Sequence, residues 1–217
     1  MKKGNRYDTS QLIENQYEEG SHSQVLKNLR GIRNKRAMEQ LETHDLLRAT
    51  DQLIDYYNRD HSFTANDICH MHKVWLGSIY EWAGSYRQVF ISKEGFSFAA
   101  PAFIPRLMEE FERDILNQYT PCTFTERNEV IRALAIVHTE LLLIHPFREG
   151  NGRIARLLAT LMGLQAGLPF LDFSDIEGEK KDAYFVAVRA GLDRNYKLMG
   201  KIFTDVILRS LKSFQNQ

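Results

Sequence analysis

Apolar residues recur at intervals of three and four along most of this chain, the spacing that gathers them on one face of an α-helix. The pattern predicts helices over residues 25–53, 64–79, 105–118, 126–144, 152–167, 182–191 and 197–214. The helix over 126–144 carries apolar side chains on nearly every side, so we expect it to be central and buried. Pro146 ends that helix, because proline lacks an amide donor and disfavours helical geometry at the residue before it.

Residues 84–98 break the helical pattern. Aromatic and β-branched residues lie on both sides of a turn that ends in glycine, which predicts a short β-hairpin with a four- or five-residue connection. A lone two-stranded hairpin is marginally stable, so it either packs on the helices or offers an edge to another chain. Because no internal repeat, low-complexity tract or linker interrupts the chain, we expect residues 1–217 to form a single all-α domain with one hairpin.

Composition narrows the choice of ligand and location. Lys and Arg number 28 and Asp and Glu number 28, so no overall field favours nucleic acid or an anionic membrane. No stretch approaches the roughly 18–20 apolar residues that span a bilayer, and no apolar run typical of a secretory signal follows the first lysines. Cys69 and Cys122 lie far apart without metal-binding spacing, as expected for free thiols. We therefore expect a cytoplasmic protein that binds a nucleotide or a polypeptide.

Candidate chemistry is concentrated in the segment His145–Arg156, between the two central helices. The segment Gly150–Gly152 lets the backbone bend and brings amide groups close to a ligand. These amides open onto the first turn of a helix, where unpaired N–H groups and the helix dipole favour an anion. Arg153 and Arg156 are three residues apart and can reach the same anion. The pattern therefore predicts a site for a phosphorylated ligand.

Three further side chains of this segment suit the same ligand. His145 has an ordinary pKa of about 6.5 and can take a proton from an attacking hydroxyl at neutral pH. Glu149 is suited to Mg²⁺, which commonly takes only one or two carboxylates when it is bound to phosphates. Phe147 would anchor the loop by its apolar bulk. Together these residues predict a catalytic site rather than a structural loop.

This segment resembles the signature of the Fic (filamentation induced by cAMP) family, His-x-Phe-x-(Asp/Glu)-Gly-Asn-Gly-Arg-x-x-Arg. Every fixed position is matched, by His145, Phe147, Glu149, Gly150, Asn151, Gly152, Arg153 and Arg156. Residues 82–87 and 95–98 resemble the flap region of the same family, and the resemblance covers roughly residues 60–205. It implies an all-α Fic fold, a helical bundle in which the hairpin is the flap.

The resemblance also implies an enzyme, a protein adenylyltransferase that moves AMP from ATP to a Tyr, Thr or Ser hydroxyl of a target protein. By this analogy His145 deprotonates the hydroxyl, and Glu149 holds Mg²⁺ on the α- and β-phosphates. The implied phosphate-binding residues are Gly150, Asn151, Gly152, Arg153 and Arg156. Tyr184 lies where the family lines its adenine pocket. The target would add a strand to the flap, on the implied docking residues Val89, Phe90, Ile91, Phe96 and Phe98.

Residues Ser10–Asn15 resemble the inhibitory pattern of the family, (Ser/Thr)-x-x-x-Glu-(Gly/Asn). Residues 1–20 would then form an inhibitory segment ahead of the core, with Ser10 and Glu14 as its fixed positions. We expect a short helix against the nucleotide site, in which Glu14 pairs with Arg156 and occupies the place of the γ-phosphate. On this hypothesis a Glu14→Gly substitution raises transfer.

Three alternative functions remain open at this point. The first is transfer of phosphate or of another nucleotide, against which the intact Gly150–Gly152 segment speaks. The second is removal of AMP from a modified target, with Glu14 activating water. The third is a non-catalytic, nucleotide-sensing regulatory module. The sequence identifies neither the target nor the modified residue type, and it leaves open self-association and whether Glu14 acts on its own chain or on a neighbour.

Overall fold

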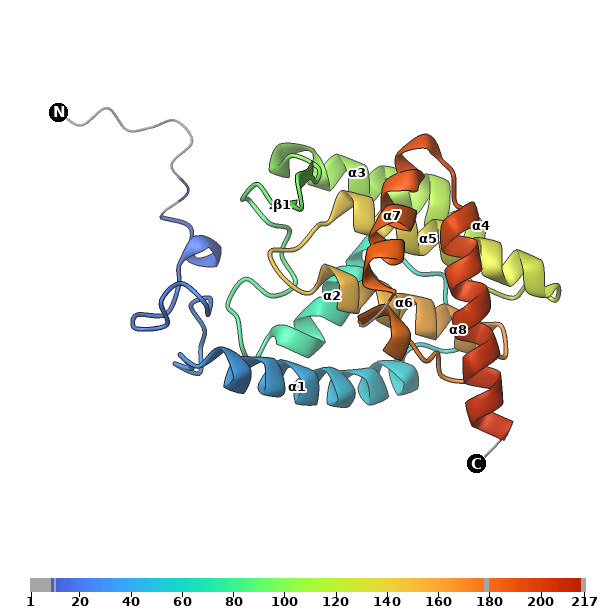
Figure 1. The fold of residues 1–217 in the computed structure, drawn as a ribbon, viewed down its shortest axis with the longest axis horizontal. Helices are drawn as coiled ribbons and strands as arrows, with labels where there is room; N and C mark the ends of the chain where they lie inside the picture. Colours follow the sequence, from blue (N-terminus) through green and yellow to red (C-terminus); the bar gives the residue numbers. More distant parts are fainter. Residues whose placement is uncertain (1–8, 10, 178–179, 216–217) are drawn as a thin grey trace.

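The helices pack around a central pair, α5 and α6, with α1 and α2 on one side and α7 and α8 on the other (Figure 1). The computed structural model describes residues 9, 11–177 and 180–215. The main helices are α1 (Lys35–Tyr56), α2 (Ala65–Leu76), α3 (Ile104–Phe111), α5 (Arg127–Ile144), α6 (Asn151–Gln165), α7 (Lys181–Ala190) and α8 (Lys197–Gln215). The shorter helical elements are η1 (Ile13–Asn15), η2 (Pro101–Phe103), η3 (Glu112–Leu116), α4 (Asn117–Tyr119), η4 (Ser174–Glu177) and η5 (Gly191–Asp193). The predicted all-α class is confirmed.

Helix α5 is buried along nearly its whole length, as its all-round apolar pattern predicts. It contacts α3, α6, α7 and α8, so its C-terminal end is held rigidly by its neighbours. The helix ends at His145, whose φ of 53° is left-handed, and α6 begins after Gly150, whose φ is 83°. The intervening loop is therefore fixed between two buried helices. Within the described part of the chain, no helix is long and apolar enough to cross a membrane.

Helix α1 begins ten residues later than the apolar pattern predicts. Residues 25–34 form a loop instead, because the Asn28 side chain accepts hydrogen bonds from the backbone amides of Arg30 and Ile32 at 3.1 and 3.0 Å. Local side-chain bonds of this kind compete with helix formation. The helix starts only after Asn34, whose side chain accepts a bond from the amide of Ala37.

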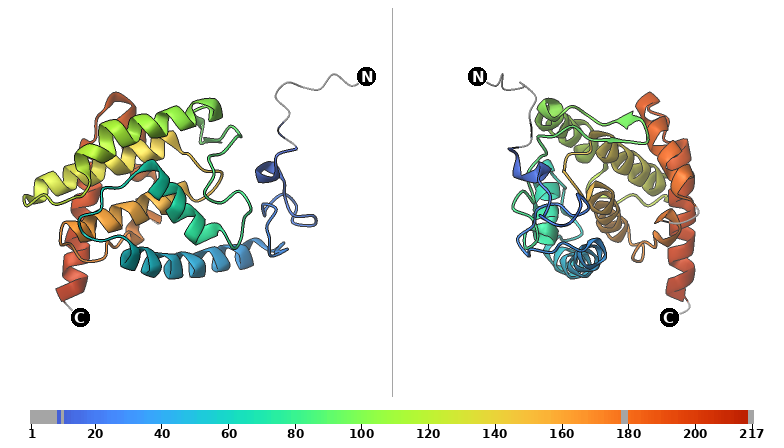
Figure 2. Two further views of the ribbon diagram at one scale, coloured as in Figure 1. Left: turned by 180° about the vertical axis from the view of Figure 1, so that it is seen from behind. Right: turned by 60° about the vertical axis from the view of Figure 1, so that its left-hand side comes forward.

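The predicted hairpin is present but is smaller than expected. Strands β1 (Ser92–Lys93) and β2 (Phe96–Ser97) pair antiparallel. They are joined by only two residues, Glu94 and Gly95, whose φ values of 51° and 75° are typical of a tight turn that matches the strand twist. The predicted four- or five-residue connection is therefore wrong. The hairpin lies beside α7, and the N-terminal segment lies at the end of the bundle where the loop between α5 and α6 emerges (Figure 2).

Candidate active site

His145 ends α5 with its imidazole held in one orientation. Its backbone amide still donates to the carbonyl of Leu141 at 3.0 Å, so the residue closes the helix although its own φ is left-handed. The ring stacks on Phe98 with a centroid distance of 3.7 Å. Nδ1 lies 3.2 Å from the carbonyl oxygen of Leu142 and therefore carries the proton. This tautomer leaves Nε2 with a free lone pair, as a general base requires.

The environment of His145 keeps its ring neutral. Burial lowers the pKa of His145 to about 4, the Leu142 carbonyl opposes this shift, and the charges of Arg87 and Lys93 add to it. A neutral imidazole at pH 7 can accept a proton. Negative charge brought into the site by a phosphate would raise this pKa and make the base stronger.

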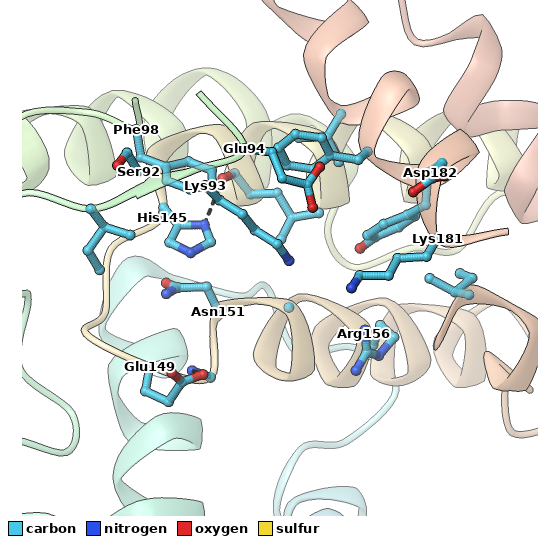
Figure 3. A pocket seen from close by; sticks show the side chains of 18 of the residues that line it. Ser92, Lys93, Glu94, Phe98, His145, Glu149, Asn151, Arg156, Lys181 and Asp182 are labelled. Carbon is cyan, nitrogen blue, oxygen red and sulfur yellow. Dashed lines mark hydrogen bonds between the residues drawn. The ribbon is translucent and has the colours of Figure 1, made fainter. Parts of the chain in front are cut away.

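A cavity of about 480 Å³ opens beside the His145 ring and is bounded by the flap, the loop between α5 and α6, and α7 (Figure 3). This volume lies in the range of small-molecule and cofactor sites. Its lining mixes apolar and charged side chains, among them Ile91, Lys93, Glu94, Phe98, Leu142, Arg148, Glu149, Arg156, Lys181, Asp182, Tyr184 and Phe185.

The loop before α6 is closed by its own side chains. Phe147 is fully buried, as predicted, and stacks on the ring of His72 at 3.9 Å. The Asn151 side chain accepts from the amide of Phe147 and donates to its carbonyl, both at 2.8 Å. We expected Asn151 to cradle phosphate. Its side-chain amide is instead committed to the loop, and it shapes the site through the backbone.

Gly150 is required by close packing as well as by its φ. A Cβ atom at this position would lie 2.5 Å from the ring of Trp75. Gly150 precedes the first turn of α6, whose unpaired N–H groups open onto the cavity. This arrangement can bind an anion through the backbone amides and the helix dipole, as predicted for the Gly150–Gly152 segment.

The two signature arginines differ in their contacts, which departs from the prediction that they share one anion. The guanidinium of Arg153 lies over the ring of Trp75 and donates to the buried carboxylate of Glu42 at 2.8 Å. It therefore ties α6 to α1. Arg156 lines the cavity, and its Nη1 lies 3.6 Å from the position that a Cβ of Gly152 would occupy. Arg156 is thus the arginine placed at the anion site.

Glu149 has the exposure expected of a metal ligand. Its side chain is 48% exposed, and one carboxylate oxygen accepts from the amide of Gly150 at 3.0 Å. The described residues contain no group of three or more His, Cys, Asp or Glu side chains that could hold an ion by themselves. A single carboxylate beside a phosphate site fits Mg²⁺, which takes most of its oxygens from phosphate and water. Glu149 would hold such an ion.

Tyr184, on α7, lines the cavity. Its hydroxyl donates to Nε2 of the buried His138 at 2.5 Å, because Nδ1 of that ring already donates to the carbonyl of Ala155. Burial raises the pKa of Tyr184, and the hydrogen-bonded guanidinium of Arg156 opposes the rise. Sequence reasoning did not identify His138, which looked like one more residue of a buried helix.

The five predicted docking residues of the flap fall into two groups. Val89 and Phe98 are 4% and 8% exposed, so they anchor the flap and are not available to a target, contrary to the prediction. Phe90 is 72% exposed, and Ile91 and Phe96 are half-buried. Only these three can contact another chain.

The tip of the flap rests on α7. Arg189 donates to the carbonyl of Glu94 at 2.8 Å, and its guanidinium lies over the rings of Phe96 and Phe185 at 5.7 and 4.6 Å. Lys93 lies over the ring of Phe185 at 5.9 Å. These contacts hold the flap across the mouth of the cavity.

The contacts of Glu14 differ from the prediction. Its carboxylate accepts from the amide of Gln88 at 2.6 Å, and its carbonyl accepts from Nε of Arg148 at 2.9 Å. Among the described residues Glu14 does not pair with Arg156, so the predicted inhibitory pair is wrong, and the cavity-lining residue that it contacts is Arg148. The segment forms a three-residue 3-10 turn, too short to place a helix against the nucleotide site. Ser10 lies outside the described residues.

Arg87 connects the flap to the catalytic loop and was not identified from the sequence. It is 1% exposed, although an arginine is seldom fully buried. Its guanidinium donates to the carbonyls of His145, Val89 and Ala99, each at 2.7 Å. The two ends of the flap, at Val89 and Ala99, are thereby fixed to His145, the residue that carries the base.

His72 supports the same loop from α2. Its Nδ1 accepts from the amide of Gly84 at 2.8 Å, so its Nε2 donates to the carbonyl of Glu149 at 3.1 Å. Burial lowers the pKa of His72 to about 4, which keeps this single tautomer. The ring thus links the start of the flap to the proposed metal ligand.

Comparison with known proteins agrees with this geometry. Residues 62–162 match the Fic/DOC family. A protein adenylyltransferase of Bartonella henselae is 31% identical over 216 residues, covering 88% of this chain and 38% of that protein. Protein adenylyltransferase Fic of Nematostella vectensis is 31% identical over 137 residues, covering 58% of this chain and 30% of that protein. The chain thus spans less than two fifths of the length of these relatives.

A solved structure has the same fold. The N-terminal Fic domain of a cell filamentation protein from Bartonella quintana, crystallised with ADP, matches with a TM-score of 0.70 at 26% identity, covering 88% of this chain and 94% of that chain. The matched region of the family includes the complete signature His145–Arg156, which the structure places at the junction of the two central helices. The chain belongs to the Fic/DOC family.

Proposed function

We propose that this chain is a protein adenylyltransferase, which transfers AMP from ATP to a Tyr, Thr or Ser hydroxyl of a target protein and releases pyrophosphate. One observation carries the proposal. The unprotonated Nε2 of His145 stands at a nucleotide-sized cavity that also receives the N-terminal turn of α6. The names of the relatives and the ADP bound to a similar domain support ATP as the substrate.

In this reaction the target hydroxyl oxygen attacks the α-phosphorus, and His145 Nε2 takes the hydroxyl proton. A new P–O bond joins AMP to the target while the bond between the α-phosphorus and its bridging oxygen to the β-phosphate breaks. Pyrophosphate leaves, and the imidazolium returns its proton to solvent. The amides of the Gly150–Gly152 segment and Arg156 bind the phosphates, where their positive charge offsets the charge that develops.

Magnesium held by Glu149 would neutralise charge on the α- and β-phosphates. A Glu149→Gln substitution should lower kcat by about 10²-fold, the order of loss when one stabilising group is removed from a charged transition state. It should also raise the Mg²⁺ concentration required for half-maximal rate. Titration of the transfer rate with Mg²⁺ measures both effects. An unchanged Mg²⁺ dependence would show that the ion, if required, is held elsewhere.

The target segment would add to the flap edge. Phe90 and the half-buried Ile91 and Phe96 supply the side chains that remain accessible there. Main-chain hydrogen bonds would align the hydroxyl with His145 while demanding little of the target sequence. AMP removal with Glu14 as base has no geometric support, because the Glu14 carboxylate accepts from Gln88 and does not line the cavity.

The chemistry of transfer is tested with ATP labelled at either end. The chain is incubated with Mg²⁺ and a cell lysate, once with α-labelled and once with γ-labelled ATP. We expect protein bands to take the α-label and not the γ-label. Incorporation of γ-label would indicate phosphate transfer. Binding of ATP without either label in protein would favour the regulatory module.

The pH profile of transfer should reflect the buried histidine. Since the pKa of His145 is lowered to about 4, the base is unprotonated above that value and is lost as the pH falls through it. We expect kcat/KM for ATP, which reports the enzyme before the nucleotide binds, to vary little between about pH 8 and pH 6 and to fall only toward about pH 4. A loss centred at the ordinary histidine value of about 6.5 would contradict the buried environment.

A further inference from the structure

Glu14 completes a closed circuit of contacts around the catalytic loop. Its carboxylate accepts from the amide of Gln88, and its carbonyl accepts from Arg148. Arg87, the neighbour of Gln88, donates from its amide to the carbonyl of Pro146 at 2.9 Å. The root of the flap, the catalytic loop and the N-terminal turn are therefore each bonded to the other two.

Charge gives Glu14 a second role in this circuit. The buried guanidinium of Arg87 donates to carbonyl oxygens, and a buried cation without a counter-charge is costly. Glu14 is 6% exposed, and its carboxylate interacts electrostatically with both Arg87 and Arg148. It supplies negative charge where two arginines meet the loop that carries His145.

The segment that presents Glu14 is itself fixed. The side chain of Asn15 donates to the hydroxyl of Thr9 at 3.0 Å across the turn. Beyond the turn, the amide of Lys27 donates to the carbonyl of Gln16 at 2.9 Å, which closes the loop between them. Glu14 is thus presented from a turn that is closed by hydrogen bonds on both sides.

We propose that Glu14 is a positioning residue for the transfer reaction, which clamps the root of the flap to the catalytic loop and so aligns a docked hydroxyl with His145. This inference rests on the proposed function. It predicts that removal of Glu14 lowers the transfer rate, whereas removal of an inhibitory glutamate would raise it. Removal of Glu14 lowers transfer, because a displacement of about 1 Å between reacting groups can cost up to about 10²-fold in rate.

Three variants separate the possibilities. Glu14→Ala removes the acceptor and the charge, and Glu14→Gln keeps an acceptor for the Gln88 amide but removes the charge. Glu19→Ala is the matched control, because Glu19 is exposed on the same segment. Transfer is measured as incorporation of α-label from saturating ATP into the proteins of a cell lysate, below the melting temperature of each variant. Affinity for a non-hydrolysable ATP analogue is measured in parallel, together with hydrogen exchange of the Gln88 amide.

We expect Glu14→Ala to lower kcat by about tenfold or more, with little change in affinity for the ATP analogue. The Gln88 amide should lose its protection in this variant and keep most of it in Glu14→Gln, whose rate should be intermediate. Glu19→Ala should match the wild type. Transfer by Glu14→Ala equal to or above the wild-type rate would overturn the proposal, and an increase would restore the inhibitory role.

The two proposals fail separately. If the wild-type chain transfers no nucleotide, the proposed function fails, and the clamp is judged by exchange alone. Protection of the Gln88 amide that is unchanged in Glu14→Ala would then refute the clamp. If Glu14→Ala does not fold, the proposal is tested with Glu14→Gln. Reduced transfer by Glu14→Gln supports the clamp, and transfer at the wild-type rate refutes it.

Discussion

A His145→Ala substitution should abolish transfer while leaving nucleotide binding largely intact. General-base catalysis contributes about 10²–10⁴-fold, and no other described side chain presents an unprotonated imidazole to this cavity. In the proposed reaction the phosphates would be held by backbone amides of α6 and by Arg156, neither of which depends on the ring. We therefore expect kcat to fall by about 10³-fold or more and the affinity for an ATP analogue to change little. Steady-state rates and calorimetric titration measure the two quantities.

The control for this variant is His44→Ala, since the His44 side chain is 77% exposed on α1. It should transfer at the wild-type rate. Loss of analogue binding in His145→Ala would mean that the ring holds the nucleotide rather than activating the hydroxyl. Retention of wild-type transfer would remove His145 as the base.

An Arg87→Met substitution should weaken both the fold and the reaction. Three carbonyl oxygens lose their donor at 2.7 Å, and each buried group left unpaired costs about 1–3 kcal/mol. We expect the free energy of unfolding to fall by about 3–5 kcal/mol, in the range of the severe single substitutions. At temperatures where the variant is folded, transfer should still be reduced, because the carbonyl of His145 is no longer fixed. Urea unfolding and transfer rates measure these effects.

Arg36→Met on the exposed face of α1 is the matched control and should leave stability nearly unchanged. Arg87→Lys keeps the charge but loses the planar fork that reaches several acceptors at once. The free energy of unfolding of Arg87→Lys should therefore be closer to that of Arg87→Met than to that of the wild type. Full stability in Arg87→Lys would show that charge alone, without the fork, fixes the flap.

The central helices and the loop between them could be predicted because the relevant signals are local. All-round apolar residues indicated the buried α5, and Pro146 marked where it ends. The helix predicted from Gly152 begins one residue earlier, at Asn151. The signature fixed the order of the chemical groups. His145, Glu149 and Arg156 consequently lie at the cavity as expected.

The errors concern contacts between segments far apart in the chain. Arg153 and Arg156 have the spacing to share an anion, but Glu42, 111 residues earlier, draws Arg153 away. The pattern around Glu14 fits an inhibitory helix, whereas Gln88, 74 residues later, captures its carboxylate. Spacing along one helix describes the faces available to a side chain. It does not reveal which distant partner competes for that side chain.

The roles of buried polar residues were also not predicted from the sequence. His138 stands among mostly apolar neighbours in a predicted helix, and Arg87 belongs to the segment that resembles the flap, but the pattern assigned neither residue a role. Their importance follows from hydrogen bonds to carbonyls and to Tyr184, which only the folded chain brings within reach. The support of the site is therefore less predictable than the site itself.

The central claim is that His145 Nε2 faces an α-phosphate bound at the N-terminus of α6. The most direct test is a crystal structure of the chain with Mg²⁺ and a non-hydrolysable ATP analogue. We predict that the phosphates contact the Gly150–Gly152 amides and Arg156, with the α-phosphorus open to attack from the side of Nε2. Phosphates bound outside this cavity, or an α-phosphorus turned away from His145, would contradict the account.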